Sequence, residues 1–231
     1  AVYEGTATVE GVTAERIYTA KKQAVEEVLQ RGRIPLLVDP DGRSIEVLKP
    51  DVVVDAIIAK KNLGTYKEMA PLVIGIGPGF VAGKDVHLVV ESMRGHNLAR
   101  ILETGSALAN TGIPGNIGGY TKERVIHAAA EGYMKNLHQI GDVVRKGEEI
   151  ARIYEQMSPE GVFSGRFVSV EATIPGVLRG LIREGYHFQK GFKIADIDPR
   201  EGELANCFTI SDKASSIGGS VLEAVCRYVN G

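Results

Sequence analysis

The chain has 231 residues, 44% of them hydrophobic, and its 27 basic and 29 acidic side chains leave a net charge of −2. This length and apolar content suit one large globular domain or two small ones and argue against disorder. Because charges of opposite sign are interspersed, we expect no surface for phosphate backbones and no nucleic-acid partner. The two cysteines, Cys207 and Cys226, are too few for a disulfide scaffold and lack the spacing of zinc ligands.

The sequence carries no sign of a membrane or secretory segment. No apolar run approaches about 18 residues, and residues 1–11 lack the basic flank and apolar core of a signal peptide. These features predict a cytoplasmic protein without membrane contact. The first residue is not methionine, and residues 1–5 read as the middle of an element, so we expect a further segment upstream.

The first half of the chain alternates between helical and strand patterns. Residues 20–30 place apolar side chains at helical spacing, and Gly32 follows as a stop. Runs rich in β-branched residues predict four strands, at 34–38, 52–58, 72–76 and 86–91. Such runs are typical of strands buried on both faces of a mostly parallel sheet. Residues 1–126 are therefore predicted to form an α/β domain with a Rossmann-like sheet.

The segment 127–197 contains one pattern twice. A shift of 44 residues superposes 127–153 on 171–197 without a gap and gives identities at nine of 27 positions, where composition alone predicts roughly two. The glycines at both ends of 141–147 suit bends that need positive φ. Two such units are expected to wrap into a small all-β barrel that resembles the barrel-sandwich hybrids of biotinyl and lipoyl domains. Those carriers hold a lysine between the halves, but 154–175 contains none, so neither biotin nor lipoate is expected.

Residues 198–231 are predicted to return to the α/β domain, which would make the barrel an insertion. A helix at 219–230 is expected to present one apolar stripe that a sheet or another helix must cover. The stripe consists of Val221, Leu222, Val225, Tyr228 and Val229. Cys226 shares this stripe and is expected to be buried, whereas Cys207 has no histidine nearby to activate it.

A glycine-rich segment at 75–85 follows the predicted strand 72–76. It does not match a nucleotide-triphosphate loop, because Pro78 stands where the first glycine is needed and Asp85 where Ser or Thr is needed. Two alternatives remain: a turn whose backbone N–H groups and Lys84 hold an anion, or a tight crossover between strands. The glycines of the anion site would be Gly77, Gly79 and Gly83.

Imidazole and guanidinium groups follow in the next segment. Arg94 and His96 lie in a predicted loop and are candidate ligand contacts, and His96 and Asp85 are also candidate proton-transfer groups. His87 alternates with apolar residues, which favours a core histidine satisfied by hydrogen bonding over a catalytic one. The sequence shows no three convergent ligands, so no metal is assigned.

Two further segments hold candidate contacts. The loop at 111–121 contains four glycines, and it either binds a ligand close to its backbone or hinges two domains. Gly115 and Asn116 favour binding, because a plain hinge would not need an amide among so many glycines. Asp55 and Lys60 flank the end of the second predicted strand, where they either face the same crevice or form a solvated strand end.

Several segments together resemble one family. They are 37–40, 54–60, 77–85, 94–96, 111–116, 191–200 and 211–214. The pattern is similar to the YqeB-type accessory proteins of selenium-dependent molybdenum hydroxylases over nearly the whole chain. The resemblance implies a maturation factor that acts with the molybdenum cofactor, or its selenium-containing form, before insertion into a hydroxylase. Relatives begin with a Rossmann-like strand and a Gly-Ala-Gly-Asp turn; this chain starts downstream of that turn, which argues against NAD(P) binding here.

These observations give a leading hypothesis and two alternatives. An anionic pterin-type cofactor would bind between the α/β domain and the barrel, with Lys84 and Arg94 neutralising its phosphate and both glycine loops supplying backbone donors. One alternative is an interaction module that docks a client hydroxylase or another maturation factor without a small molecule. The other is a nucleotide-dependent enzyme that acts on a small metabolite. Homo-oligomerisation is left open, and no catalytic step is assigned.

Overall fold

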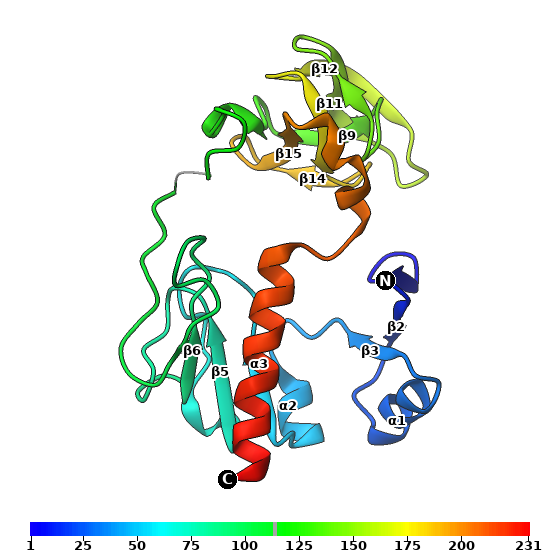
Figure 1. The fold of residues 1–231 in the computed structure, drawn as a ribbon. Coiled ribbons are helices and arrows are strands. Elements are labelled where there is room, and N and C mark those ends of the chain that lie inside the picture. The colour runs from blue at the N-terminus through cyan, green and yellow to red at the C-terminus, as the bar shows by residue number, and fades with distance from the viewer. Residues whose placement is uncertain (113–114) are drawn as a thin grey trace. The chain divides into compact units, whose positions relative to one another are not determined.

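The computed structural model describes residues 1–112 and 115–231, a mixed α/β arrangement of several sheets and few helices (Figure 1). It divides into two compact units: unit 1 comprises 1–111 and 210–231, and unit 2 comprises 112–209. Unit 2 extends beyond the sequence repeat at both of its ends. Ile113 and Pro114, which belong to the predicted binding loop, lie outside the described residues. Among the described helices, none has the length and apolar character needed to cross a membrane.

The first sheet of unit 1 is built around one β-α-β connection. Its elements, with the helix that follows, are β1 (Thr6–Val9), β2 (Val12–Ile17), α1 (Lys22–Gln30), β3 (Ile34–Leu37) and α2 (Arg43–Leu48). β2 runs antiparallel to β1 and parallel to β3. The helix predicted over 20–30 and the strand predicted over 34–38 are confirmed, whereas no sequence pattern predicted β1, β2 or α2. Within α1, Val28 is buried and Ala24 and Val25 are half-buried, whereas Leu29 is 54% exposed.

The second sheet of unit 1 carries the candidate site. Its elements, with the helix that covers it, are β4 (Val52–Asp55), η1 (Lys67–Met69), β5 (Leu72–Ile76), β6 (Leu88–Val90), β7 (Ile101–Leu102) and α3 (Asp212–Asn230). The strand order is β4-β5-β6-β7; β4, β5 and β6 are parallel, and β7 is antiparallel to β6. The crossovers between the parallel strands are loops with one short 3-10 helix, where a Rossmann sheet would have α-helices.

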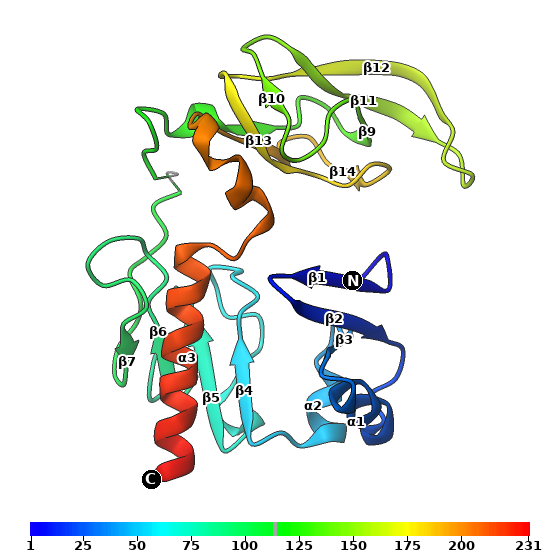
Figure 2. The ribbon, with the colours of Figure 1, turned by 45° about the vertical axis from the view of Figure 1, so that its right-hand side comes forward.

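Apolar layers cover both faces of β5. On one face, its residues Leu72, Ile74 and Ile76 pack in one cluster with Ala224 of α3, which lies along the sheet (Figure 2). On the other face, Val73 packs against side chains of the crossover that follows β5, namely Phe80, Ala82 and Val86. All five residues of β5 are buried, as its continuous apolar run predicts.

Two predicted strands are longer than the observed ones. The run 52–58 forms a strand only up to Asp55, because the Asp55 carboxylate accepts the N–H of Ile57 (3.1 Å) and turns the chain out of the sheet. Ile57 is consequently 69% exposed. The run 86–91 forms a strand only over Leu88–Val90.

The prediction for the last helix is wrong in its start and in its buried face. α3 begins at Asp212, not at 219, because the Ser211 hydroxyl oxygen accepts the N–H of Ala214 (3.2 Å) as an N-cap. Its packed side chains are Ile217, Val221 and Ala224. Leu222 and Val229 of the predicted stripe are 63% and 71% exposed, and Cys226 is exposed as well. A helix on a sheet buries a narrow stripe, which the wider set of apolar residues in the sequence does not define.

Unit 2 consists of two four-stranded antiparallel sheets. Its elements are η2 (Lys122–Arg124), β8 (Val125–His127), β9 (Gly132–Asn136), β10 (Val143–Val144), β11 (Glu149–Met157), β12 (Phe163–Glu171), β13 (Gly176–Leu181), β14 (His187–Phe188), β15 (Lys193–Asp198) and η3 (Glu201–Phe208). The strand orders are β10-β13-β15-β8 and β12-β11-β9-β14. The segment between the repeats forms the long β11–β12 hairpin.

The sequence repeat is also a structural repeat. A shift of 44 residues carries β9 onto β13, β10 onto β14 and β11 onto β15, and it exchanges the two sheets. The backbone bonds repeat with it: the Gly141 N–H donates to the Leu178 carbonyl (2.9 Å), and the Gly185 N–H donates to the Met134 carbonyl (2.7 Å). The repeated apolar residues meet in one core, with Met134 and Leu178 both fully buried. Each sheet therefore takes strands from both halves, which ties the halves together.

We predict that two equivalent glycines are among the most sensitive positions of unit 2. A Cβ at Gly132 would overlap the carbonyl oxygen of Tyr154, and one at Gly176 would overlap that of Asp198. Their φ values are 154° and 147°. Gly132→Ala and Gly176→Ala should each lower the free energy of unfolding in urea by about 2–4 kcal/mol.

Gly147→Ala is the matched control, because Gly147 has a φ of 84° but no atom within 4 Å of the added Cβ. It isolates the conformational strain and should cost only about 1–2 kcal/mol. Equal losses in all three variants would show that the close backbone approach is not what requires glycine.

Candidate functional site

The carboxyl ends of β4, β5 and β6 meet at one edge of the parallel sheet, where open α/β sheets commonly bind ligands. Asp55 ends β4 at this edge and is only 8% exposed. One carboxylate oxygen accepts the Ile57 N–H, and the other accepts the Thr65 hydroxyl (2.6 Å). Asp55 therefore fastens both ends of the loop 56–65, and its role in the structure is to shape that loop.

The loop 56–65 holds two residues in the left-handed region of backbone space. Ile58 has a φ of 59° and Lys60 a φ of 64°, which is costly for a β-branched residue such as isoleucine. Asn62 stabilises the loop, since its side-chain oxygen accepts the N–H groups of Gly64 (2.8 Å) and Thr65 (2.7 Å). Strain of this kind persists where surrounding bonds over-determine it, and it is concentrated at functional sites.

The glycines of the segment 75–80 allow other parts of the chain to pack closely against their backbone. A Cβ at Gly75 would lie 2.5 Å from the Phe80 ring, and one at Gly77 would overlap the Ser92 hydroxyl. A Cβ at Gly79 would lie 2.6 Å from the backbone of Lys61. The chain itself fills the space beside these glycines, so close packing requires glycine at these positions whether or not the turn also binds an anion. The Gly79 contact also packs this loop directly against the loop 56–65.

Lys84 and Asp85 lie in a turn away from that edge. A parallel crossover must return to the amino end of the sheet, and Ala82 pairs with Gly105, which follows β7 beside the start of β6. Asp85 accepts the Val81 N–H (3.0 Å), so its carboxylate caps the turn. Gly83, in the same turn, donates its N–H to the Val86 carbonyl (2.8 Å). Lys84, Asp85 and Gly83 are therefore not grouped with Gly77 and Gly79.

Arg94 and Glu91 organise the segment after β6. The Arg94 guanidinium donates to both carboxylate oxygens of Asp212 at the start of α3 (2.6 and 2.9 Å), and His96 is exposed in the same loop. Glu91 is 3% exposed and accepts the N–H groups of Met93 and Leu108, each at 2.7 Å. Both charged groups thus hold chain segments in place.

α3 brings its N-terminus to the carboxyl edge of the sheet. Arg94 follows β6 and binds the first turn of α3, whereas Arg227 near the other end of α3 binds Glu103, which follows β7 (3.4 Å). The helix consequently runs antiparallel to β4, β5 and β6. A helix N-terminus carries a partial positive charge. The positively polarised end of α3 therefore lies at the carboxyl edge of the sheet.

His87 is half-buried and satisfied by a hydrogen bond, so the predicted bond is present although the side chain is not fully in the core. Its Nδ1 accepts the backbone N–H of Val73 (3.0 Å) just before β6. Burial lowers the pKa of His87 below the usual 6.5, because a charged imidazole loses hydration there. The hydrogen bond requires an unprotonated Nδ1, so geometry and pKa agree that His87 is neutral at pH 7.

We predict that His87 makes unit 1 less stable in mild acid. Because its pKa is lower in the folded than in the unfolded chain, its stabilising contribution is complete above about pH 6.5 and is lost as the pH falls through the folded-state value. His87→Asn places an amide oxygen near the position of Nδ1 and does not titrate. Thermal unfolding of the variant should therefore depend less on pH between about pH 7 and 5 than that of the parent chain. An unchanged pH dependence would exclude His87 as its source.

Gly115 and Asn116 belong to unit 2. The Gly115 carbonyl accepts a hydrogen bond from the buried Arg124 (3.3 Å), and the Asn116 side-chain oxygen accepts the Gly119 N–H (3.1 Å). Asn116 therefore shapes its own turn. A Cβ at Gly115 would meet no atom within 4 Å, and its φ is not in the left-handed region, so local packing does not require glycine there.

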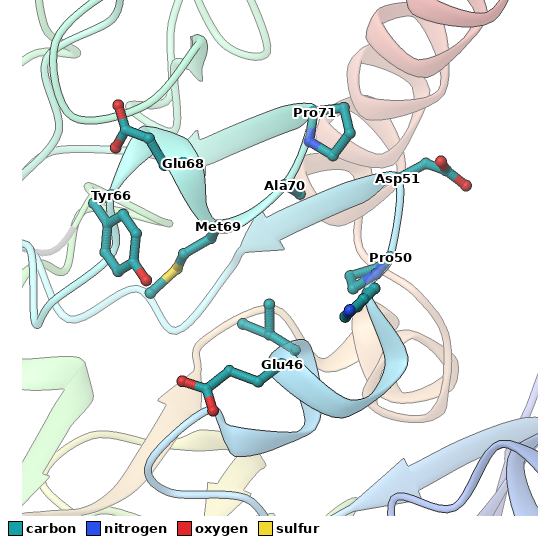
Figure 3. Close-up of a pocket in the computed structure, with 10 residues that line it drawn as sticks. Glu46, Pro50, Asp51, Tyr66, Glu68, Met69, Ala70 and Pro71 are labelled. Carbon is teal, nitrogen blue, oxygen red and sulfur yellow. The ribbon is translucent and has the colours of Figure 1, made fainter.

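A separate hollow of about 620 Å³ lies at the amino ends of β4 and β5 (Figure 3). Its apolar lining includes Ile45, Tyr66 and Met69, and carboxylates are supplied by Glu46, Asp51 and Glu68. Sequence reasoning missed it because its lining comes from α2, the chain around residue 50 and the segment 66–71. It contains none of the predicted site residues.

Among the described residues, no group of three or more His, Cys, Asp or Glu side chains is placed to hold a metal ion. Cys207 is half-buried, and burial raises the pKa of its thiol. Its thiol form is thus favoured, which suits neither a nucleophile nor a metal ligand.

The chain is 48% identical over 230 residues to the uncharacterized protein YqeB of Escherichia coli (strain K12). The match covers all of this chain and 40% of that relative, so the chain spans less than half of the relative's length. The resemblance to YqeB-type proteins that the motifs predict is confirmed by this match. No protein-family model matches the chain.

Two solved structures match the chain weakly. The ectoine utilization protein EutE (DoeB) from Ruegeria pomeroyi matches at 16% identity and a TM-score of 0.26, covering 43% of this chain and 28% of that one. An aspartoacylase family protein from Mesorhizobium loti matches at 14% identity and a TM-score of 0.27, covering 46% of this chain and 32% of that one. Likeness at this level carries no argument.

Proposed function

We propose that this chain is part of an accessory protein for the maturation of selenium-dependent molybdenum hydroxylases. In this proposal, the carboxyl edge of β4, β5 and β6 in unit 1 holds the phosphate of an anionic pterin-type cofactor. The pathway is inferred from the resemblance of the motifs, and the position of the binding edge from the geometry of unit 1. The cofactor supplies redox chemistry to the hydroxylase, and the residues of this chain are proposed only to hold its phosphate.

The observation that carries the binding proposal is the meeting of positive features at one edge. Lys60 and Lys61 are exposed on the strained loop after β4, and the backbone of Lys61 packs on Gly79 of the loop after β5. The N-terminus of α3 lies at the same edge. Among the described residues, no hydrogen bond uses the N–H of Gly79 or Phe80. Lysines, a helix N-terminus and unused backbone donors together suit a phosphate.

The carboxylates at this edge repel an anion less than their number implies, because each of them already accepts hydrogen bonds. Asp55 accepts from Ile57 and Thr65, Glu91 accepts from two backbone N–H groups, and Asp212 is paired with Arg94. Each carboxylate is thus already compensated by donors within unit 1. The proposal accordingly relies on Lys60 and Lys61, and it assigns Arg94 to holding α3 and Lys84 to the opposite end of the sheet.

The binding proposal predicts a specific loss in a double variant. Lys60→Ala/Lys61→Ala in the full chain should raise the dissociation constant for molybdenum cofactor, measured by equilibrium dialysis at low salt, roughly tenfold or more. Lys84→Ala is the matched control, because it removes one exposed lysine at the other end of the sheet. It should change the constant by no more than about twofold. Because the control removes one charge and the double variant two, a loss of binding free energy in Lys84→Ala about half that of the double variant would mean general charge attraction. No effect of the double variant would remove this site.

The pathway is tested separately from the binding edge. Hydroxylase purified from cells that lack the full-length protein should contain less molybdenum cofactor and selenium per polypeptide than hydroxylase from cells that make it. Elemental analysis of the two preparations measures this directly. Equal contents would refute the maturation role even if the edge binds phosphate.

We further propose that unit 2 is a barrel-sandwich hybrid of the biotinyl and lipoyl type without a carrier lysine. The exchange of strands between its two sheets under the repeat supports this assignment. The alternative function, docking of a client hydroxylase without a small molecule, has one supporting observation. The β11–β12 hairpin exposes apolar side chains at Val162 (63%), Phe167 (46%) and Val168 (40%). Binding of hydroxylase that survives Lys60→Ala/Lys61→Ala and is lost on changes in this hairpin would favour docking.

A further inference from the structure

The outer face of the sheet β12-β11-β9-β14 carries a row of aromatic rings. Tyr154 pairs directly with Tyr133 on one side and with Phe167 on the other, so the three rings share one face. Ring centroids lie 5.2 Å apart for Tyr154 and Phe167, and 5.4 Å apart for Tyr154 and Phe163. His187 extends the row, with its ring 4.6 Å from that of Tyr133. The row therefore crosses all four strands of the sheet.

The repeat provides an internal comparison for this face. Val177 occupies on β13 the position that Tyr133 occupies on β9. Val177 is fully buried without belonging to the main core of unit 2, and η3 packs against its strand. Tyr133 is only partly buried. The chain thus covers the outer face of one sheet with its own η3, while the equivalent part of the other face stays open and is built from aromatic rings.

A hollow of about 360 Å³ lies on this open face. It is lined by Tyr133, Glu155, Gln156, Met157, Ser158 and Ser164. Gln156 and Ser164 are directly paired across β11 and β12, so the extended hairpin forms its wall. A volume of this order suits a small ring system.

The charged groups around the hollow have partners within unit 2, and Glu160, next to the lining, accepts the Ser158 hydroxyl (2.6 Å). Glu155, the one ionisable carboxylate of its lining, binds Arg166 (3.1 Å). Arg152 lies over the Phe167 ring and pairs with Glu149 (2.9 Å). Lys135 in turn pairs with Glu184 (3.1 Å). Each of these ion-paired charges is thus compensated, so none of them selects a ligand by its charge.

The unused polar groups of the hollow are neutral. Within the described residues, no hydrogen bond uses the side chains of Gln156, Ser164 or Tyr133. An amide offers a donor and an acceptor side by side, which is the pattern that asparagine and glutamine use on the edge of a purine. An aromatic side chain beside such an amide gives a face on which a flat ring stacks.

We propose that this hollow in unit 2 binds a neutral, planar heteroaromatic ring of the purine type. The ring would stack on Tyr133, and its edge would bond to the amide of Gln156, with Ser164 as an additional partner. This site does not depend on the phosphate edge of unit 1, so either proposal can fail without the other.

The test is a titration of the intact chain with adenosine, guanosine and free ribose, followed by saturation-transfer NMR of the small molecule. At least one of the two nucleosides should bind saturably and ribose should not. Gln156→Leu removes the amide at an exposed position, and Tyr133→Val introduces the residue that the second repeat carries. Each change should weaken nucleoside binding about tenfold or more. Phe167→Leu, on the same face but outside the lining of the hollow, should change it less than twofold.

Several outcomes would overturn the proposal. They are no saturable binding of either nucleoside, ribose binding as well as a nucleoside does, and unchanged binding in Gln156→Leu. If Tyr133→Val lowers the thermal stability of the chain, Gln156→Leu decides, because its exposed side chain makes no bond within the described residues.

Discussion

The parallel pairing of β4, β5 and β6 is the constraint on which the rest of unit 1 depends. It collects three strand ends at one edge, and it forces each crossover to return to the opposite edge before the next strand begins. Lys60 and Lys61 lie on the loop that starts at the first of these ends. Lys84, although only a few residues beyond Gly79, has already been carried toward the other end. Strand direction, and not distance along the sequence, thus decides which groups can act together.

A second constraint shapes unit 2, where the two halves of the repeat have to pack together in one pair of sheets. Glycine at 132 and 176 lets the chain touch the carbonyls of Tyr154 and Asp198, and each half gives strands to both sheets. The two outer faces are then free to differ. η3 covers one of these faces. Next to η3, the buried Asp198 binds Arg179 and Arg200. Arg200 is the main cause that holds the pKa of Asp198 well below its usual range. The other face remains open and aromatic.

The sequence predicts local features well and long-range partners poorly. The spacing of residues along the chain is enough to predict the buried strand β5, the helix α1 and the 44-residue repeat. β4 ends where it does because the Asp55 side chain accepts a nearby N–H. The sequence does not predict this end, since the apolar run continues to Ile58. The sequence around Arg94 predicts a cation in a loop. In the structure, α3 places Asp212, 118 residues away in sequence, beside Arg94. Leu222 has the spacing of a packed residue, but the sheet contacts only the neighbouring stripe of α3.

In the proposed function, a phosphate is held at the carboxyl edge of β4, β5 and β6. Backbone amide NMR of the full chain during titration with inorganic pyrophosphate tests it most directly. If the phosphate binds there, the largest, saturable shifts should occur at the amides of Gly79, Phe80, Lys60 and Lys61, with little change at Lys84 and Asp85. Shifts centred on the turn at Lys84, or shifts that spread over the surface without saturation, would contradict it.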